Sequence, residues 1–316
     1  MGIILHVGAH RTGTTTLQRV ARQNEARLAA RGIAVWGPWR TRKGLLAGAF
    51  ASGGGRMGGH PVERVAGRIA LAVEAERRRG MVDIFVSEEN LVGTVGRNVA
   101  SASLYADAAE RLLRAARVFG PDVRRVCLGI RRQDCYWASA IASWVKRGGT
   151  MPGRATIALI AGRRARWQPL CLALAEAFPD AERIVWTFEA MAALPEVAMG
   201  RALGRPLGPL EGMRDRHNAA PDARALREIL GARGDTRPVP GLEEAGRDGR
   251  YMPFDRAERR ALHDAWTEDI AWLRAGADGA VTYVDSPAAH GSGGDGRKDD
   301  RCQANETSGR SWRHVN

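Results

Sequence analysis

The chain has 316 residues, of which 44% are hydrophobic, so it can bury a substantial core as one large α/β domain or two small ones. A formal net charge of +13 favours an anionic partner, such as a nucleotide, an acidic glycan, a nucleic acid or a lipid surface. Almost all of the cations are arginine, which often reflects genome composition, so part of this charge carries no functional information. The regular aromatic and basic pattern of an RNA-binding module is absent, and we expect no nucleic-acid partner.

The sequence shows no pattern of export, membrane insertion or metal binding. The first apolar run is too short for a signal peptide and lacks a basic flank, and no stretch reaches the length of a transmembrane helix. The four cysteines have neither CxxC nor metal-ligand spacing, and Cys127 and Cys171 fall in apolar segments that are typical of buried thiols. We therefore expect a cytoplasmic protein with no transmembrane segment and no metal.

Strands and helices alternate along the chain. Short apolar, β-branched runs predict strands at 3–7, 33–36, 82–86, 123–130, 184–188 and 281–284. Apolar periodicity predicts helices at 14–30, 61–79, 104–119, 137–147, 170–178, 222–230 and 256–273. This order predicts an α/β three-layer sandwich, with a central, mostly parallel sheet flanked by helices as in P-loop NTPases. A single domain over 1–285 suffices, and the Gly-, Ser- and charge-rich segment 286–316 is expected to be a disordered tail.

The segment after the first predicted strand has the layout of an anion-binding loop. A loop with Gly8 and Gly13 joins strand to helix, which directs backbone N–H groups and the positive end of the helix at an anion. The two glycines have P-loop spacing, but Thr14 stands where the Walker lysine belongs, and Thr15 follows it. Arg11 supplies a cation inside the loop instead. One guanidinium with a cluster of hydroxyls suits a phosphosulfate better than the metal-clamped phosphates that a nucleotide kinase handles.

Residues 10–18, which read HRTGTTTLQ, resemble the phosphosulfate-binding loop of sulfotransferases, in particular of bacterial members that read HKTGTTxLQ. Arg11 replaces the lysine that is usual in that family. The resemblance implies PAPS (3′-phosphoadenosine 5′-phosphosulfate) as the cosubstrate, no metal, and transfer of the sulfuryl group to a hydroxyl or amine acceptor, either a glycan or a small metabolite. It also implies a donor-binding set in the loop, which consists of His10, Arg11, Thr12, Gly13, Thr14, Thr15 and Thr16.

A second anion site is predicted where the fourth strand ends. Arg131 follows strand 123–130, and Ser139 lies eight residues later, in the next helix. Arginine suits a fixed phosphate because its planar fork meets two oxygens at once. Sulfotransferases pair an arginine with a serine at this spacing to hold the 3′-phosphate of the donor, and a looser resemblance in a later segment adds Arg216. Considered without the loop motif, Arg131 is equally consistent with a surface cation and Ser139 with an ordinary helix position.

Sulfuryl transfer also needs a base for the acceptor proton and stabilisation of the charge on the leaving phosphate. Arg11 can stabilise that charge, but it cannot donate a proton. The resemblance favours Glu88, at the end of the third strand, as the base, and strand alternation turns Glu89 to the opposite face. His60, in the Gly-rich segment 52–60, is the alternative base because histidine titrates near neutral pH. That segment reads either as a substrate lid or as a solvated linker.

Two other functional classes are open. A P-loop kinase or NTPase would share the loop, but Thr14 replaces its lysine, and no apolar strand ends in a convincing Walker B aspartate. A non-catalytic relative that kept the nucleotide-binding fold would fit the Arg11 replacement and the unsettled base. The resemblance is specific over residues 3–146 and diffuse up to residue 273, and it does not name the acceptor.

Overall fold

The computed structural model describes residues 1–50, 60–215, 219–242 and 249–285. Within them, one six-stranded sheet has the order β2-β3-β1-β4-β5-β6, and every neighbouring pair is parallel. The strands are β1 (Gly2–His6), β2 (Ile33–Trp36), β3 (Asp83–Ser87), β4 (Val123–Ile130), β5 (Glu182–Thr187) and β6 (Thr282–Val284). The predicted fold class and all six predicted strands are therefore confirmed, with end points that agree to within two residues.

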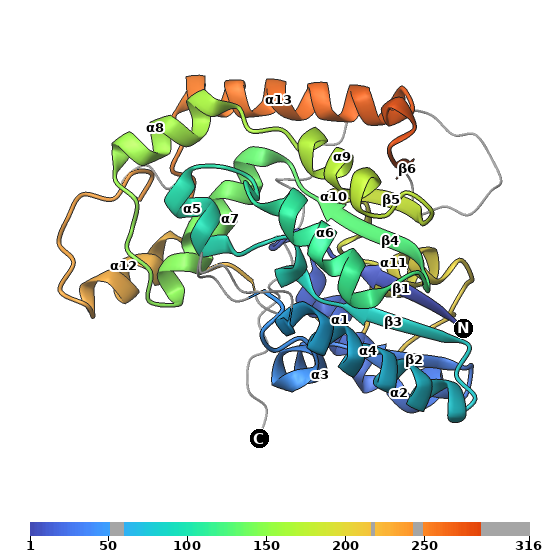
Figure 1. The fold of residues 1–316 in the computed structure, drawn as a ribbon. Helices are drawn as coiled ribbons and strands as arrows, with labels where there is room; N and C mark the ends of the chain where they lie inside the picture. The colour runs from blue at the N-terminus through green and yellow to red at the C-terminus, as the bar shows by residue number, and fades with distance from the viewer. Residues whose placement is uncertain (51–59, 216–218, 243–248, 286–316) are drawn as a thin grey trace.

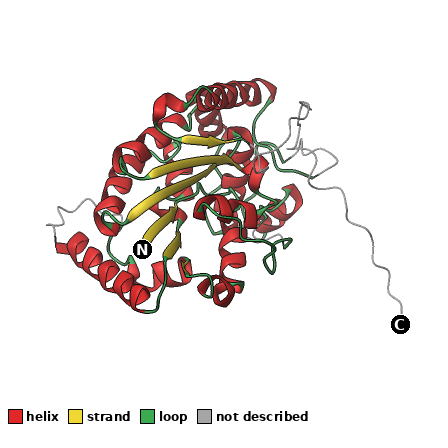
Figure 2. Ribbon diagram, turned by 90° about the vertical axis from the view of Figure 1, so that its right-hand side faces the viewer, coloured by secondary structure: helices red, strands yellow, loops and turns green. Residues whose placement is uncertain are grey.

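Helices lie on both sides of the sheet, which Figure 2 shows as a twisted layer between them. They are α1 (Thr14–Gln23), α2 (Glu25–Ala29), α3 (Pro38–Arg40), α4 (His60–Arg78), α5 (Val95–Ser101), α6 (Ala108–Phe119), α7 (Gln133–Lys146), α8 (Arg154–Arg163), α9 (Gln168–Ala177), α10 (Phe188–Met191), α11 (Pro195–Leu203), α12 (Ala223–Gly231) and α13 (Arg256–Arg274). A π-helical segment (Thr41–Leu45) and two 3-10 turns (Glu89–Leu91 and Ala277–Gly279) complete the described elements.

Alternation along the central strand divides the core into two layers. Ile3 and Leu5 of β1 pack with side chains of α4, α6, α7 and α9, whereas Ile4 packs on the other face with side chains of α1, α2 and α11. Successive strand residues point to opposite faces, so a strand that is apolar throughout must be covered on both sides. The result is the three-layer sandwich that the element order predicts.

The position of β1 brings three loops together. β1 lies between β3 and β4, and His6 at its end is in register with Ser87 of β3 and Cys127 of β4. After β1 the chain builds β2 and β3 on one side of it, and it then crosses to β4 on the other side. A parallel sheet that changes direction in this way leaves a crevice at the carboxyl ends of its strands.

Two further helices, α7 and α13, pack against each other. α7 follows β4 directly and is buried on nearly all sides, as expected of a helix with apolar residues around its whole circumference. α13 lies across α7 and α8, along the top of the molecule in Figure 1. No helix in the described part of the chain is both long and apolar enough to cross a membrane.

Candidate functional site

The loop between β1 and α1 has the backbone of an anion cradle. Arg11 and Gly13 both have positive φ angles, 66° and 84°, and Gly13 is the N-cap of α1. Intrahelical hydrogen bonding starts at Leu17 N, which donates to Gly13 O, so the amides of the first helical turn point out of the helix. That turn carries no acidic residue, and the positive end of the helix is not neutralised locally.

Gly8 and Thr14 leave an unsatisfied hydroxyl inside the cradle. A Cβ atom at Gly8 would lie 2.8 Å from Thr14 Oγ1, so only glycine fits this close approach. Thr14 is 5% exposed, and its Oγ1 has no hydrogen-bond partner among the described residues. A buried polar atom without a partner is uncommon in native proteins and indicates a site for a further group.

The two predicted anion motifs meet in the structure. Arg11 Nε donates a hydrogen bond to Ser139 Oγ at 2.9 Å, and Arg131 Nη1 donates to the Arg11 carbonyl at 3.1 Å. Arg131 stands directly after β4, with its guanidinium over the ring of Phe188, 4.2 Å from the ring centre, while its Nε is buried and has no partner among the described residues. The loop, the end of β4 and the middle of α7 therefore share one polar cluster.

The guanidinium groups of Arg11 and Arg131 are partly removed from solvent, and this lowers the pKa of both. Burial, reinforced by the charges of Arg131 and Arg147, lowers the pKa of Arg11 to about 10. Burial also lowers the pKa of Arg131, against the opposing effect of Glu189. Both groups stay cationic at neutral pH, and two half-buried guanidiniums side by side form a favourable place for an anion.

His10 holds the loop against the helical layer rather than facing an anion. Its backbone N–H donates to Tyr105 Oη at 2.8 Å, and its ring lies 2.9 Å from the same oxygen through Nδ1 and 3.2 Å from Asn90 Oδ1 through Nε2. The amide oxygen accepts only, so Nε2 carries the proton and Nδ1 accepts from the tyrosine hydroxyl. Burial lowers the pKa of His10, which favours this neutral form. The resemblance places His10 in the donor-binding set, whereas these contacts give it a supporting role in the loop.

Glu88 lies at the carboxyl edge of β3 with its carboxylate fully engaged. It is 2% exposed and accepts from Thr41 Oγ1 at 2.6 Å, from Arg42 Nη2 at 2.6 Å and from Asn90 N at 3.1 Å. These bonds make Glu88 the anchor of the Thr41–Leu45 segment. It could act as a base only after Arg42 had moved off its carboxylate.

Glu89 differs from its sequence prediction, because it turns toward the loop rather than to the opposite face. Its Oε2 accepts from Gln18 Nε2 of α1 at 2.8 Å, and its Oε1 lies 3.0 Å from Arg42 Nη2. Strand alternation predicts the orientation only as far as the strand extends. β3 ends at Ser87, and the 3-10 turn at Glu89–Leu91 breaks the period of two.

His6 is a residue of the site that the sequence analysis did not identify. Its ring is stacked between Phe85 and Trp186, with ring centres 6.1 Å and 5.6 Å away, and its Nδ1 lies 2.9 Å from Ser87 Oγ. Burial lowers its pKa to about 4. Within an apolar strand run a single histidine gives no signal of this kind, although its place directly before the loop could have marked it.

The structure does not describe the side chains of two predicted site residues. Arg216 and the side chain of His60 lie outside the described residues, as does most of the Gly-rich segment 52–60. The predicted buried thiols are placed: Cys127 and Cys171 are buried, and burial raises the pKa of both. Among the described residues, no group of three or more His, Cys, Asp and Glu side chains could hold a metal ion.

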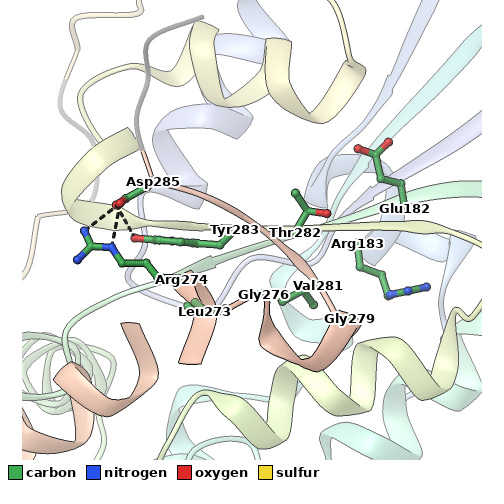
Figure 3. Close-up of a pocket in the computed structure, with 10 residues that line it drawn as sticks. All are labelled: Glu182, Arg183, Leu273, Arg274, Gly276, Gly279, Val281, Thr282, Tyr283 and Asp285. Atoms are coloured by element: carbon green, nitrogen blue, oxygen red, sulfur yellow. Dashed lines mark hydrogen bonds and ion pairs between the residues drawn. The ribbon is translucent and has the colours of Figure 1, made fainter. Parts of the chain in front are cut away.

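A hollow away from this cluster lies at the β5–β6 edge of the sheet (Figure 3). It measures about 670 Å³, and its charged groups already have partners. Arg274 pairs with Asp285 at 2.9 Å, Tyr283 Oη donates to Asp285 Oδ1 at 3.0 Å, and Arg183 donates to backbone carbonyls.

A smaller hollow lies at the loop itself, lined by His6, Thr12, Gly13, Thr14, Leu17, Trp186, Met191, Ala192, Pro195 and Ala198. The loop cluster, and not the β5–β6 edge, is therefore the candidate site.

Comparison with known proteins adds no relative to this description: no family model, no curated protein and no solved structure matches the chain.

Proposed function

We propose that this protein is a sulfotransferase that takes the sulfuryl group from PAPS and transfers it to a hydroxyl or amine acceptor. The observation that carries the proposal is the junction of the two motifs, in which Arg11 bonds to Ser139 while Arg131 bonds to the backbone of Arg11. A 3′-phosphoadenosine nucleotide has two separate anionic ends. The cluster offers one donor set in the loop and another at Arg131 and Ser139.

The residues present fit such a ligand. Thr14 Oγ1 in the cradle and Arg131 Nε at the end of β4 are buried atoms with no partner among the described residues. An anion at each place would supply the missing acceptors, and charge-assisted bonds of this kind are about twice as strong as neutral ones. The amides at the start of α1 add the helix N-terminus to the first of these places.

In the reaction, the acceptor atom attacks sulfur, the S–O bond to the 5′-phosphate breaks with its electron pair left on that phosphate, and the acceptor proton passes to a base. Arg11 stabilises the charge that develops on the leaving phosphate. With a pKa lowered only to about 10, it stays protonated at neutral pH and acts as a fixed charge rather than as an acid. Glu88 is the proposed base, in a state where Arg42 has left its carboxylate.

A calorimetric titration with 3′-phosphoadenosine 5′-phosphate (PAP, the desulfated product), run beside ATP with Mg²⁺, tests the donor. We expect PAP to bind the wild-type protein tightly and Arg131→Ala to weaken that binding. Binding of ATP with Mg²⁺ alone would assign the chain to the kinases, and binding of neither would contradict nucleotide binding altogether. PAP binding without transfer from PAPS to any member of a broad acceptor panel would favour a non-catalytic relative.

A further inference from the structure

A buried carboxylate on α13 lies next to the candidate site without belonging to it. Asp269 is 1% exposed, and it occupies the inward face of α13 together with Leu262, Ala265 and Leu273. An acidic side chain on the apolar stripe of a helix is costly to bury unless it is bonded on every side. The groups that donate hydrogen bonds to Asp269 therefore indicate which segments of the chain it fixes.

Asp269 receives four hydrogen bonds from two other segments. Its Oδ2 accepts from Gln133 Nε2 at 2.7 Å and from the Trp167 backbone N–H at 2.9 Å. Its Oδ1 accepts from Arg166 Nε at 2.7 Å and from the Gln168 backbone N–H at 3.3 Å. The carboxylate thus caps the start of α9 and at the same time holds the first residue of α7.

Both of these segments are connected to Arg131, one through a hydrogen bond and the other through the chain. Trp167 is fully buried, and its indole Nε1 donates to the Arg131 carbonyl at 2.8 Å. Gln133, also fully buried, stands two residues after Arg131 at the N-terminus of the helix that carries Ser139. One carboxylate thereby fixes the backbone on both sides of Arg132, from the carbonyl of Arg131 to the start of α7.

The cradle at the β1–α1 loop meets this assembly at the Arg11 carbonyl, which accepts from Arg131 Nη1, but the loop also has anchors of its own. The loop is held by Tyr105 and Asn90 through His10, and these residues lie on other segments. Removing Asp269 should therefore loosen the Arg131 end of the site more than the loop end.

We propose that Asp269 is a positioning residue that sets Arg131 for the 3′-phosphate of the nucleotide, and so sets the preference for 3′-phosphorylated over unphosphorylated adenine nucleotides. This inference rests on the proposed function. Asp269 does not touch the ligand; it acts through Trp167 and Gln133. Its effect is selective, because it is confined to the end of the nucleotide that Arg131 holds.

The test compares PAP with AMP, which lacks the 3′-phosphate, by calorimetry on the full chain. We expect Asp269→Asn to lower the affinity for PAP by about tenfold and to leave the affinity for AMP nearly unchanged. Asp264→Asn is the matched control, since Asp264 is exposed on the same helix and undergoes the same substitution. This control should keep both affinities.

An equal loss for PAP and AMP in Asp269→Asn, or no loss for PAP, would overturn the role of Asp269. If that variant does not fold, Trp167→Phe is measured instead, because it removes the indole donor to Arg131 and leaves Asp269 in place; the same selective loss is then expected, and an unchanged preference for PAP overturns the proposal. A wild-type protein that binds PAP and AMP equally would contradict the proposed donor itself. A wild-type preference for PAP that survives in the variants contradicts only the positioning role.

Discussion

Arg11 Nε lies 2.9 Å from Ser139 Oγ, although 128 positions separate the two residues in the chain. The first belongs to the loop after β1 and the second to the helix after β4, and the parallel pairing of these two strands places both at one edge of the sheet. The bond links the loop to α7, the helix that begins two residues after Arg131. Arg11 stands where the sulfotransferase loops that this loop resembles carry lysine, and it reaches Ser139 through a nitrogen that lysine does not have.

This bond predicts an energetic coupling between the two side chains. In a double-mutant cycle of Arg11→Lys and Ser139→Ala, measured as PAP affinity, we expect a coupling of about 1 kcal/mol, because lysine lacks the donor that Ser139 accepts. Ser143→Ala is the matched control, since Ser143 is also buried on α7, one turn further on. Strictly additive effects of the two substitutions would show that the bond does not contribute to nucleotide binding.

Arg131 and Arg11 should differ in the step that they affect. Arg131→Ala is expected to weaken PAP binding by about 2 kcal/mol, the order of a lost bond to a charged group, because it removes a half-buried guanidinium from a ground-state contact. Arg11→Ala should lower the transfer rate more than the affinity, because its charge acts on the leaving phosphate. Single-turnover kinetics with PAPS separate the two quantities. Equal losses of both quantities in both variants would refute this division.

The ion pair between Arg42 and Glu88 predicts a stability effect. Arg42→Ala leaves Glu88, whose side chain is 3% exposed, as a buried carboxylate with one strong partner fewer. The Arg42 side chain is 43% exposed, so water offsets part of the loss, and we expect about 1–2 kcal/mol of destabilisation in urea unfolding. Arg78→Ala, which breaks an exposed pair with Glu74, should change the unfolding free energy by less than about 0.5 kcal/mol. Similar values for the two variants would mean that Arg42 is an ordinary surface cation.

The same ion pair shows where sequence reasoning stops. Strand order and the two anion motifs follow from the sequence, because apolar runs mark buried strands and the carboxyl ends of parallel strands share one edge. Arg42 lies in the π-helical segment Thr41–Leu45, whose path no periodicity encodes, so its contact with Glu88 could not be foreseen. Glu89 was misplaced for a related reason, since the turn that orients it begins where the strand pattern ends.

The burial of Asp269 can be predicted from the sequence. Leu262, Ala265, Asp269 and Leu273 follow the 3- and 4-residue spacing of an inward helix face, so a carboxylate on that stripe predicts a buried network. The partners of that carboxylate were out of reach, because they come from α7 and the start of α9, more than a hundred residues earlier. The position of a charged residue on the apolar face of a helix predicts that it is buried. Its hydrogen-bond partners can be identified only from the tertiary structure.

His6 predicts how stability depends on pH. Its pKa is lowered from 6.5 to about 4, chiefly by burial, so below pH 6.5 the unfolded chain binds a proton that the folded chain refuses until the pH approaches 4. Its contribution is therefore present above pH 6.5 and is lost as the pH falls toward 4. Between pH 7 and pH 5 the loss from this one group is about 2 kcal/mol.

Urea unfolding of the wild type and of His6→Asn at these two pH values measures this contribution. Asparagine keeps a polar atom near the position of Nδ1, which faces Ser87, but it does not titrate. We expect the variant to be less stable at pH 7 and to lose less stability on acidification than the wild type. It retains the part due to His10, whose pKa burial also lowers. The control is His263→Gln, which removes an exposed histidine of α13 and leaves His6 in place. An unchanged pH dependence in His6→Asn would show that the stacked ring is not the group that titrates.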